Sequence, residues 1–155
     1  MAKERIRQKA ADNFYYHKDF HIALNYVVDY LYRRFGANAV REYLQQFTEA
    51  YYIPLKETLK EKGLTALKQR YEDIYKIEGA EFNMQLGKND LLMRLESSPA
   101  YKHIQLQGHI VSPMFSETVK TVMKSLCCDT PYDVEIMEYN DENSAYTVRF
   151  YRRIN

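Results

Sequence analysis

The chain has 155 residues, with 22 Lys and Arg against 21 Asp and Glu, which gives a formal net charge of +1 at pH 7. This length fits one domain with a buried core. The near balance of charges argues against nucleic acid or an anionic membrane as the main partner, because both attract a basic surface. No apolar run approaches the roughly 18 residues of a membrane span. The two cysteines are adjacent and cannot build a disulfide framework, so we expect a cytoplasmic protein.

The N-terminal third of the sequence has helical periodicity. Residues 1–11 are polar and charged and lack the apolar segment of a secretory signal, so we expect a tail there and a single domain over residues 12–155. Apolar side chains at helical spacing predict a first helix over residues 12–35. Gly36 follows directly and suits the end of that helix.

A proline interrupts the next helical stretch. We expect the second helix to begin with Asn38 as its capping residue and to end at Gly63. Because proline removes one backbone hydrogen bond and crowds the preceding turn, the sequence predicts a kink or break over residues 50–54. A shorter third helix is expected over residues 65–77.

The second half of the chain alternates between strand and helix patterns. Period-two alternation with turn residues between the runs predicts hairpins over residues 82–95 and 132–150. Ser98–Pro99 and Ser112–Pro113 each place a capping residue before a proline, which predicts two more helices. The predicted fold is therefore α+β, in the order ααα-ββ-αα-ββ. A four-stranded antiparallel sheet made of two hairpins packs against about five helices.

Two histidines provide the main candidate site. His17 and His21 lie four residues apart near the start of the first helix, so their rings can act on one ligand or one atom. Imidazole is the side chain most easily used as an acid or base near neutral pH. The alternatives are two structural histidines at the edge of the core, or a divalent metal ion, which needs a third protein ligand. No cofactor is predicted, and Glu78 and Glu81 are expected to be solvated charges.

Further candidates surround this pair. Cys127 is a candidate nucleophile, although a thiol at a helix C-terminus is more often a small buried apolar group. Tyr16, Tyr51 and Tyr52 are candidate ligand-binding residues, with core packing as the alternative. His103 is a further candidate at the rim of the pocket.

The outer side of the first helix is apolar as well. Ile22, Tyr26 and Tyr30 form a second stripe there, and a monomer rarely exposes such a stripe. This pattern favours a homodimer. It also supports the alternative that the protein is a non-catalytic interaction or sensor module.

The C-terminal part of the chain resembles a known superfamily. A helix that runs into Cys127–Tyr132 (CCDTPY), followed by a hairpin with Glu135 and Glu138, is similar to the vinyl-reductase-type and TRAPP-subunit-like ligand-binding domains. Within that superfamily it resembles the L-2-amino-thiazoline-4-carboxylic acid hydrolase-like proteins, which are small bacterial domains. The resemblance implies an α+β fold with a small-molecule pocket between sheet and helices. Vinyl-reductase-type domains often carry further cysteines in the final hairpin, whereas residues 133–155 contain none.

These observations give two expectations about function. The first is a small-molecule-binding domain or hydrolase-like protein, acting on a small polar or heterocyclic compound, with His17 and His21 at the pocket rim. By the resemblance alone, the reaction would be hydrolysis of a C–N bond. The second is the dimeric interaction or sensor module without enzyme activity.

Overall fold

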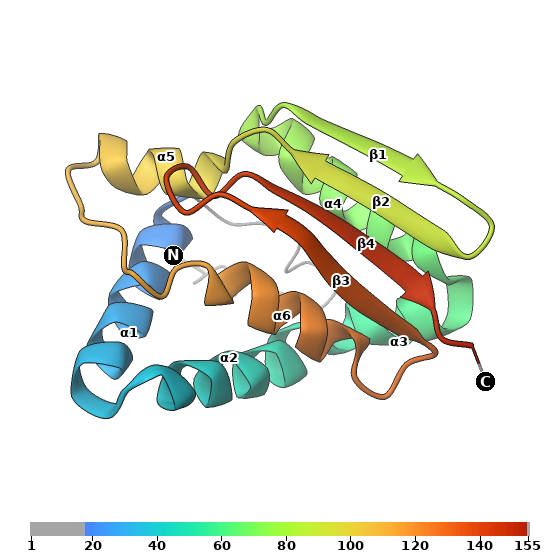
Figure 1. Ribbon diagram of the computed structural model, residues 1–155, viewed down its shortest axis with the longest axis horizontal. Coiled ribbons are helices and arrows are strands. Elements are labelled where there is room, and N and C mark those ends of the chain that lie inside the picture. Colours follow the sequence, from blue (N-terminus) through green and yellow to red (C-terminus); the bar gives the residue numbers. More distant parts are fainter. Residues whose placement is uncertain (1–17, 155) are drawn as a thin grey trace, which may run out of the picture.

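The computed structural model describes residues 18–154. Within that range the chain forms six helices and four strands, which confirms the predicted α+β class (Figure 1). In chain order they are α1 (Asp19–Phe35), α2 (Ala37–Tyr51), α3 (Ile53–Lys62), α4 (Leu64–Glu78), β1 (Phe82–Leu86), β2 (Asp90–Leu95), α5 (Pro99–Leu106), α6 (Glu117–Cys127), β3 (Tyr132–Tyr139) and β4 (Tyr146–Arg152).

The predicted break before Pro54 accounts for the sixth helix. α2 ends at Tyr51, and α3 begins at Ile53 with Pro54 in its first turn, where the missing N–H needs no partner inside the helix. Gly36 lies between α1 and α2 with φ 88°, and its N–H donates to the Tyr32 carbonyl. This positive φ favours glycine and turns the chain sharply from one helix into the next.

Two predicted helix starts are wrong. Asn38 does not cap α2, since it lies inside the first turn, where its Oδ1 accepts a hydrogen bond from Arg41 Nη1. Ser112 does not start α6, which begins at Glu117. The Ser112 N–H donates instead to Oδ1 of the buried Asn25, at 2.8 Å, and this hydrogen bond ties the loop before α6 to α1. The Ser98 cap is confirmed, because its Oγ accepts from the Tyr101 N–H.

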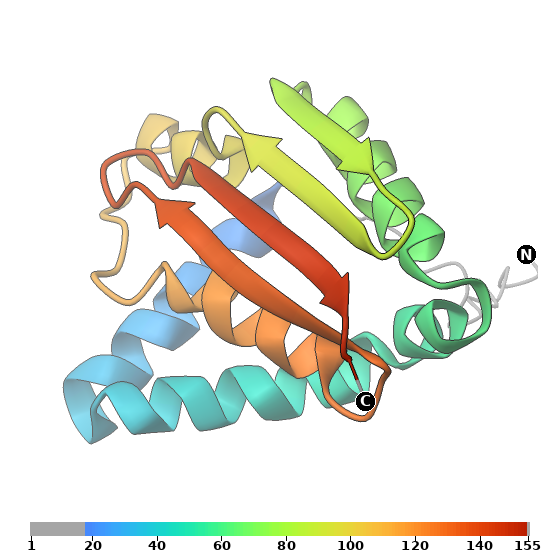
Figure 2. The ribbon, with the colours of Figure 1, turned by 45° about the vertical axis from the view of Figure 1, so that its right-hand side comes forward.

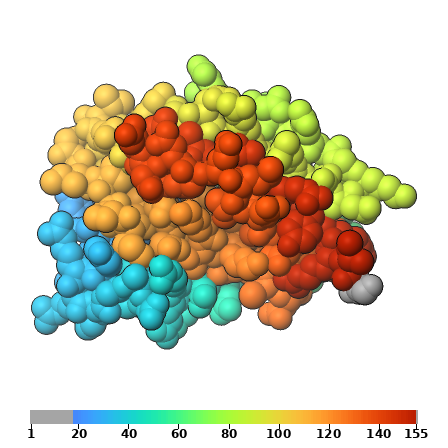
Figure 3. Space-filling view, in the orientation of Figure 1, coloured from blue at the N-terminus to red at the C-terminus, as the bar shows by residue number. Residues whose placement is uncertain are grey.

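The four strands form one antiparallel sheet in the order β1-β2-β4-β3. β4 lies in the middle beside β2, so the two predicted hairpins join as expected. Alternate residues on the inner face, including Met93, Val148 and Phe150, are buried. Strands β3 and β4 lie on the face seen in Figure 3. Along both strands, buried side chains alternate with more exposed ones.

The helices lie on one side of this sheet (Figures 1 and 2). α4 packs against β1 and β2, while α6 packs against β3 and α2. α1 crosses beside α2 and α5, so its first turn lies near the end of α4 and the start of α5. A main core joins the sheet, α4 and α6, and a second cluster joins α1, α2 and α6. No helix among the described residues combines the length and apolar composition needed to span a bilayer.

Candidate functional site

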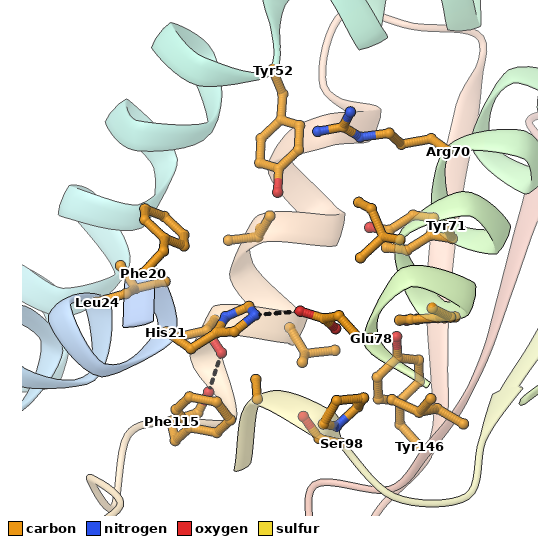
Figure 4. A pocket seen from close by; sticks show the side chains of 18 of the residues that line it. Phe20, His21, Leu24, Tyr52, Arg70, Tyr71, Glu78, Ser98, Phe115 and Tyr146 are labelled. Atoms are coloured by element: carbon orange, nitrogen blue, oxygen red, sulfur yellow. Dashed lines mark hydrogen bonds and ion pairs between the residues drawn. The ribbon is translucent and has the colours of Figure 1, made fainter. Parts of the chain in front are cut away.

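A cavity of about 180 Å³ lies between these two clusters (Figure 4). Helices α1, α2, α4 and α6 surround it, and the start of α5 and the inner face of the sheet close it. Aromatic rings form much of the wall, namely Phe20, Phe47, Tyr51, Tyr71, Phe115 and Tyr146. An apolar cavity of about 150 Å³ is enough to hold one benzene molecule. The hollow therefore has the size of a compound with one or two small rings.

An aromatic stack borders the cavity on the side of α1 and α2. The exposed ring of Phe20 stacks on Phe47 and on Tyr51, with ring centres 6.1 and 6.3 Å apart. Phe47 and Tyr51 in turn stack at 5.3 Å with an interplanar angle of 12°. These rings present flat, polarisable faces, on which another planar ring can stack.

His21 and Glu78 form a hydrogen-bonded pair in the cavity wall. His21 Nε2–H donates to Glu78 Oε1 at 2.7 Å, and the two side chains are 22% and 4% exposed. His21 comes from the first turn of α1, whereas Glu78 is the last residue of α4. The dipole at a helix C-terminus disfavours a carboxylate there, and burial disfavours it further. The imidazole partner offsets both effects.

The periodicity of α4 explains why a carboxylate lies inside. Glu78 follows Tyr71 by seven residues, Ile74 by four and Tyr75 by three, so all four share one face of the helix. That face packs against the sheet and borders the cavity. The expectation that Glu78 is a solvated charge is therefore wrong, because it ends the inner face of α4.

Three tyrosine hydroxyls point into the cavity around this pair (Figure 4). They come from Tyr52 after α2, Tyr71 on α4 and Tyr146 on β4. Burial, with a smaller contribution from the neighbouring Tyr51, raises the pKa of Tyr52 to about 12. Burial also raises the pKa of Tyr71 and of Tyr146 well above the ordinary value. All three are therefore protonated at neutral pH.

Arg70 adds a positive charge to the same wall. Its guanidinium lies beside Tyr52 in Figure 4. This charge partly offsets the rise in the pKa of Tyr52 and of Tyr71. The cavity thus combines apolar rings with a carboxylate, an imidazole, a guanidinium and phenol groups.

The structure brings only some of the sequence-predicted residues together. His21, Tyr51 and Tyr52 line the cavity. His17 and Tyr16 lie outside the described residues, so their part in the site stays a prediction.

His103 lies outside the cavity. Its Nε2–H donates to Asp19 Oδ1 at 2.8 Å. It lines an adjoining polar hollow, into whose wall Glu78 also extends.

Cys127 is fully buried in the main core and does not line the cavity. Burial, with a smaller contribution from the Asp133 charge, raises the pKa of its thiol to about 12. A thiolate is the reactive form of cysteine, so this environment favours the packing role over the nucleophilic one. Cys128 is exposed, and both cysteines are free.

The sequence alone did not assign four residues of this wall to the site, namely Glu78, Arg70, Tyr71 and Tyr146. Helical spacing marks Tyr71 and Glu78 as inward, and strand alternation with Val148 and Phe150 marks Tyr146 as inward. No local signal distinguishes a side chain that faces a hollow from one that faces packed core.

The metal alternative lacks support in the part of the chain that the structure describes. Residues 18–154 contain no group of three His, Cys, Asp or Glu side chains placed to hold a metal ion. His21 and Glu78 offer two such side chains, already bonded to each other.

No protein-family model matches the chain, and no curated protein matches it at a significant level. What the site can do follows from its geometry. An imidazole whose Nε2–H is held by a carboxylate can accept a hydrogen bond from a ligand, or take a proton from it, at Nδ1. The aromatic walls exclude water and favour planar, mostly apolar molecules.

Proposed function

We propose that the protein binds a small ring-containing molecule in this cavity and that the His21–Glu78 pair engages a polar group of the ligand. The observation that carries the proposal is the position of the pair, a nearly buried carboxylate and its imidazole in the wall of an aromatic hollow. Pockets of this kind, mostly apolar with a few convergent polar groups, are the usual form of small-molecule sites.

A purely structural role explains the pair less well. Burying a carboxylate carries a desolvation penalty of several kcal/mol, and a hydrophobic pair of the same volume is often as stable or more so. Glu78 also stands at the helix end where the dipole opposes its charge. A ligand that uses the pair gives a reason for this arrangement that packing alone does not.

The resemblance to the L-2-amino-thiazoline-4-carboxylic acid hydrolase-like proteins extends the proposal to catalysis. In that version His21, with its Nε2–H held by Glu78, would take a proton from water at Nδ1 while the water oxygen bonds to the carbon of a C–N bond in a heterocyclic substrate. The imidazolium would return the proton to the nitrogen as the C–N bond breaks. We also propose a cytoplasmic location, with which the two free cysteines are compatible.

Titration with two ring compounds tests the binding function. Naphthalene should bind saturably, and 2-naphthol should bind more tightly because its hydroxyl can pair with His21 or Glu78. Val119→Phe places a ring inside the cavity and should abolish binding of both compounds. Val27→Phe, at an exposed position on α1 outside the cavity, is the matched control and should leave binding unchanged.

The double substitution His21→Ala/Glu78→Ala separates the pair from the hollow, because either residue alone could still accept from the hydroxyl of 2-naphthol. This double variant should remove the advantage of 2-naphthol while leaving naphthalene binding within about twofold. Absence of saturable binding, or binding that Val119→Phe leaves intact, would contradict the proposed site. Native mass spectrometry of the purified protein adds a test that assumes no ligand, because a bound compound should shift the wild-type mass and not that of Val119→Phe.

The second candidate is a homodimeric interaction module. Tyr26 and Tyr30 of the predicted stripe are exposed on α1, as is Phe35 at the end of that helix. Ile22 of the stripe packs instead against the buried residues Ala100, Ile104 and Phe115. The exposed rings favour association with a second copy of the chain. Sedimentation at micromolar concentration should then give a dimer that Tyr30→Lys dissociates, and a wild-type monomer would reject this candidate.

A further inference from the structure

A second hollow, of about 190 Å³, lies at the end of α4 opposite to Glu78. The α3–α4 turn, the β1–β2 turn and the end of β4 meet there (Figures 1 and 2). Its lining includes the cationic side chains of Lys62, Lys88 and Arg152, and none of the described residues that line it is acidic. Arg152 pairs with Tyr132 across β4 and β3, and its guanidinium lies 5.8 Å from the centre of the Tyr132 ring. The hollow thus gathers positive charge on a chain whose net charge is only +1.

The start of α4 adds backbone donors to this hollow. The first N–H groups of a helix have no carbonyl partner inside the helix. The Ala66 N–H bonds to the Gly63 carbonyl, whereas the N–H groups of Leu64 and Thr65 bond to no described residue. Gly63 stands at the capping position and has no side chain to accept from them. Free N–H groups at the positive end of the helix dipole favour an anion.

The Tyr132 hydroxyl is a separate sign of a ligand in this hollow. Tyr132 lines the hollow, but the residue is only 8% exposed because its ring packs in the main core. A Cβ on Gly63 would lie 2.8 Å from Tyr132 Oη, so the hydroxyl points to the start of α4 and the glycine leaves room for it. No hydrogen bond within residues 18–154 engages this hydroxyl, whereas the Tyr139 hydroxyl is bonded to Ser144 Oγ at 2.6 Å. Buried tyrosine hydroxyls normally have a partner, and a group bound in the hollow would supply it.

These donors suit a phosphate group better than a carboxylate. A phosphate monoester carries a charge of about −1.5 to −2 at pH 7 and three strong acceptor oxygens, whereas a carboxylate has one charge and two oxygens. We infer that the hollow binds a phosphate group, either inorganic phosphate or the phosphate of a small molecule. The Leu64 and Thr65 N–H groups and the Tyr132 hydroxyl donate to its oxygens, and the three cationic side chains neutralise its charge.

This phosphate site is separate from the aromatic cavity. α4 has 15 residues, so its two ends lie about 20 Å apart, with the phosphate site at one end and Glu78 at the other. The inference therefore goes beyond the proposed function and does not depend on it.

An NMR titration of the full chain, followed through its amide resonances, tests this site. At pH 7 and constant ionic strength, inorganic phosphate should shift the Leu64 and Thr65 resonances saturably, and acetate should not. Tyr132→Phe removes only the hydroxyl and should weaken phosphate binding about tenfold, the usual effect of losing a hydrogen bond to a charged group. Arg152→Gln removes one exposed cation and should weaken it about two- to fivefold.

Matched substitutions outside the hollow are the controls. Tyr30→Phe and Arg34→Gln change an exposed phenol and an exposed cation on α1, and both should leave the phosphate affinity within twofold. Glycerol 3-phosphate identifies the source of the group. Tighter binding of this ester than of inorganic phosphate supports a phosphorylated small molecule, and equal or weaker binding supports the free ion.

Three results would overturn the phosphate site. They are the absence of a saturable shift, an affinity for acetate equal to that for phosphate, and phosphate binding that both Tyr132→Phe and Arg152→Gln leave unchanged. If Tyr132→Phe does not fold, Lys62→Gln at the exposed end of α3 takes its place, with the two- to fivefold loss expected for a cation.

Discussion

The His21–Glu78 pair allows a quantitative prediction for stability. His21→Ala leaves the Glu78 carboxylate, 4% exposed, without its hydrogen-bond donor. Removing one partner of a fully buried ion pair costs about 3–5 kcal/mol. Here the adjoining hollow and the 22% exposure of His21 allow water to approach, so we expect a loss of about 2 kcal/mol. For a chain of this size that corresponds to a fall in Tm of roughly 4–8 °C.

The double-mutant cycle isolates the interaction. Glu78→Ala should cost about 1 kcal/mol, because a neutral imidazole at the rim can bond to water instead. The double variant should cost about 1 kcal/mol as well, since it leaves no unpaired charge. The coupling free energy is then about 2 kcal/mol, within the range found for residues in direct contact. Urea unfolding at pH 7, with the midpoint and slope fitted separately, measures all four proteins.

The second histidine pair provides the control. His103 donates to Asp19 at 2.8 Å, almost the distance of the first pair, but the Asp19 side chain is 65% exposed. His103→Ala should therefore cost less than about 1 kcal/mol, as for surface pairs. If His21→Ala stays within about 0.5 kcal/mol of wild type and the cycle is additive, Glu78 is not enclosed as described. The argument for a ligand that uses the pair would then lose its basis.

Three further variants test other parts of the structure. Asn25→Ala removes the amide that bonds to two backbone groups of the loop before α6, and should lower the free energy of unfolding by about 2–4 kcal/mol in urea titrations, whereas a change below 1 kcal/mol would contradict the described contacts. Burial raises the pKa of Asp133, but the Lys124 ammonium and a backbone N–H outweigh it and hold that pKa below its ordinary value. The pKa of Asp133 is lower in the folded protein than in the unfolded chain, so its ionised form stabilises the fold above pH ~4 and this stabilisation disappears as the pH falls. Asp133→Asn should therefore be less stable than wild type at pH 7 but not at strongly acidic pH. The pKa of Tyr52 is about 12, against an ordinary value of about 10, so its contribution to stability is full below pH ~10 and decreases as the pH rises towards ~12. Between pH ~10 and ~12, Tyr52→Phe should therefore lose less stability than the wild type does.

Much of the fold could be predicted because local patterns and tertiary packing agree. The alternation of apolar and polar residues predicts both hairpins, and in the first of them Met84 pairs with Met93. The Ser98 cap starts α5 as expected. The start of α6 could not be predicted in this way. Ser112 has the same local signal as Ser98, and its Oγ accepts from the Met114 N–H, but the α-helix begins only at Glu117. The Ser112 N–H bonds to Asn25, 87 residues earlier in the chain, and a contact at that distance is absent from any local window.

Only one member of the His21–Glu78 pair could be predicted from the sequence. Histidine spacing identified His21, because imidazoles are rare and chemically informative. Its partner is a glutamate in a chain with 21 acidic residues, and only the continuation of the α4 face marks it as unusual. The pairing joins residues 57 apart and depends on where α1 crosses the end of α4. That crossing follows from packing, which composition and periodicity do not specify.

The break at Pro54 links the fold to the chemistry of the cavity. On a continuous helix, consecutive side chains point about 100° apart, so Tyr51 and Tyr52 would not both face one small hollow. Because α2 ends at Tyr51, the Tyr52 backbone leaves the helical conformation, with φ −99° and ψ 15°. The two rings then meet edge to face at 83°, and both line the cavity. Tyr51 joins the aromatic stack, and Tyr52 extends its hydroxyl towards the buried pair (Figure 4). The interruption of the second helix at Pro54 thus lets Tyr51 supply a stacking surface and Tyr52 a hydrogen-bond donor to the same site.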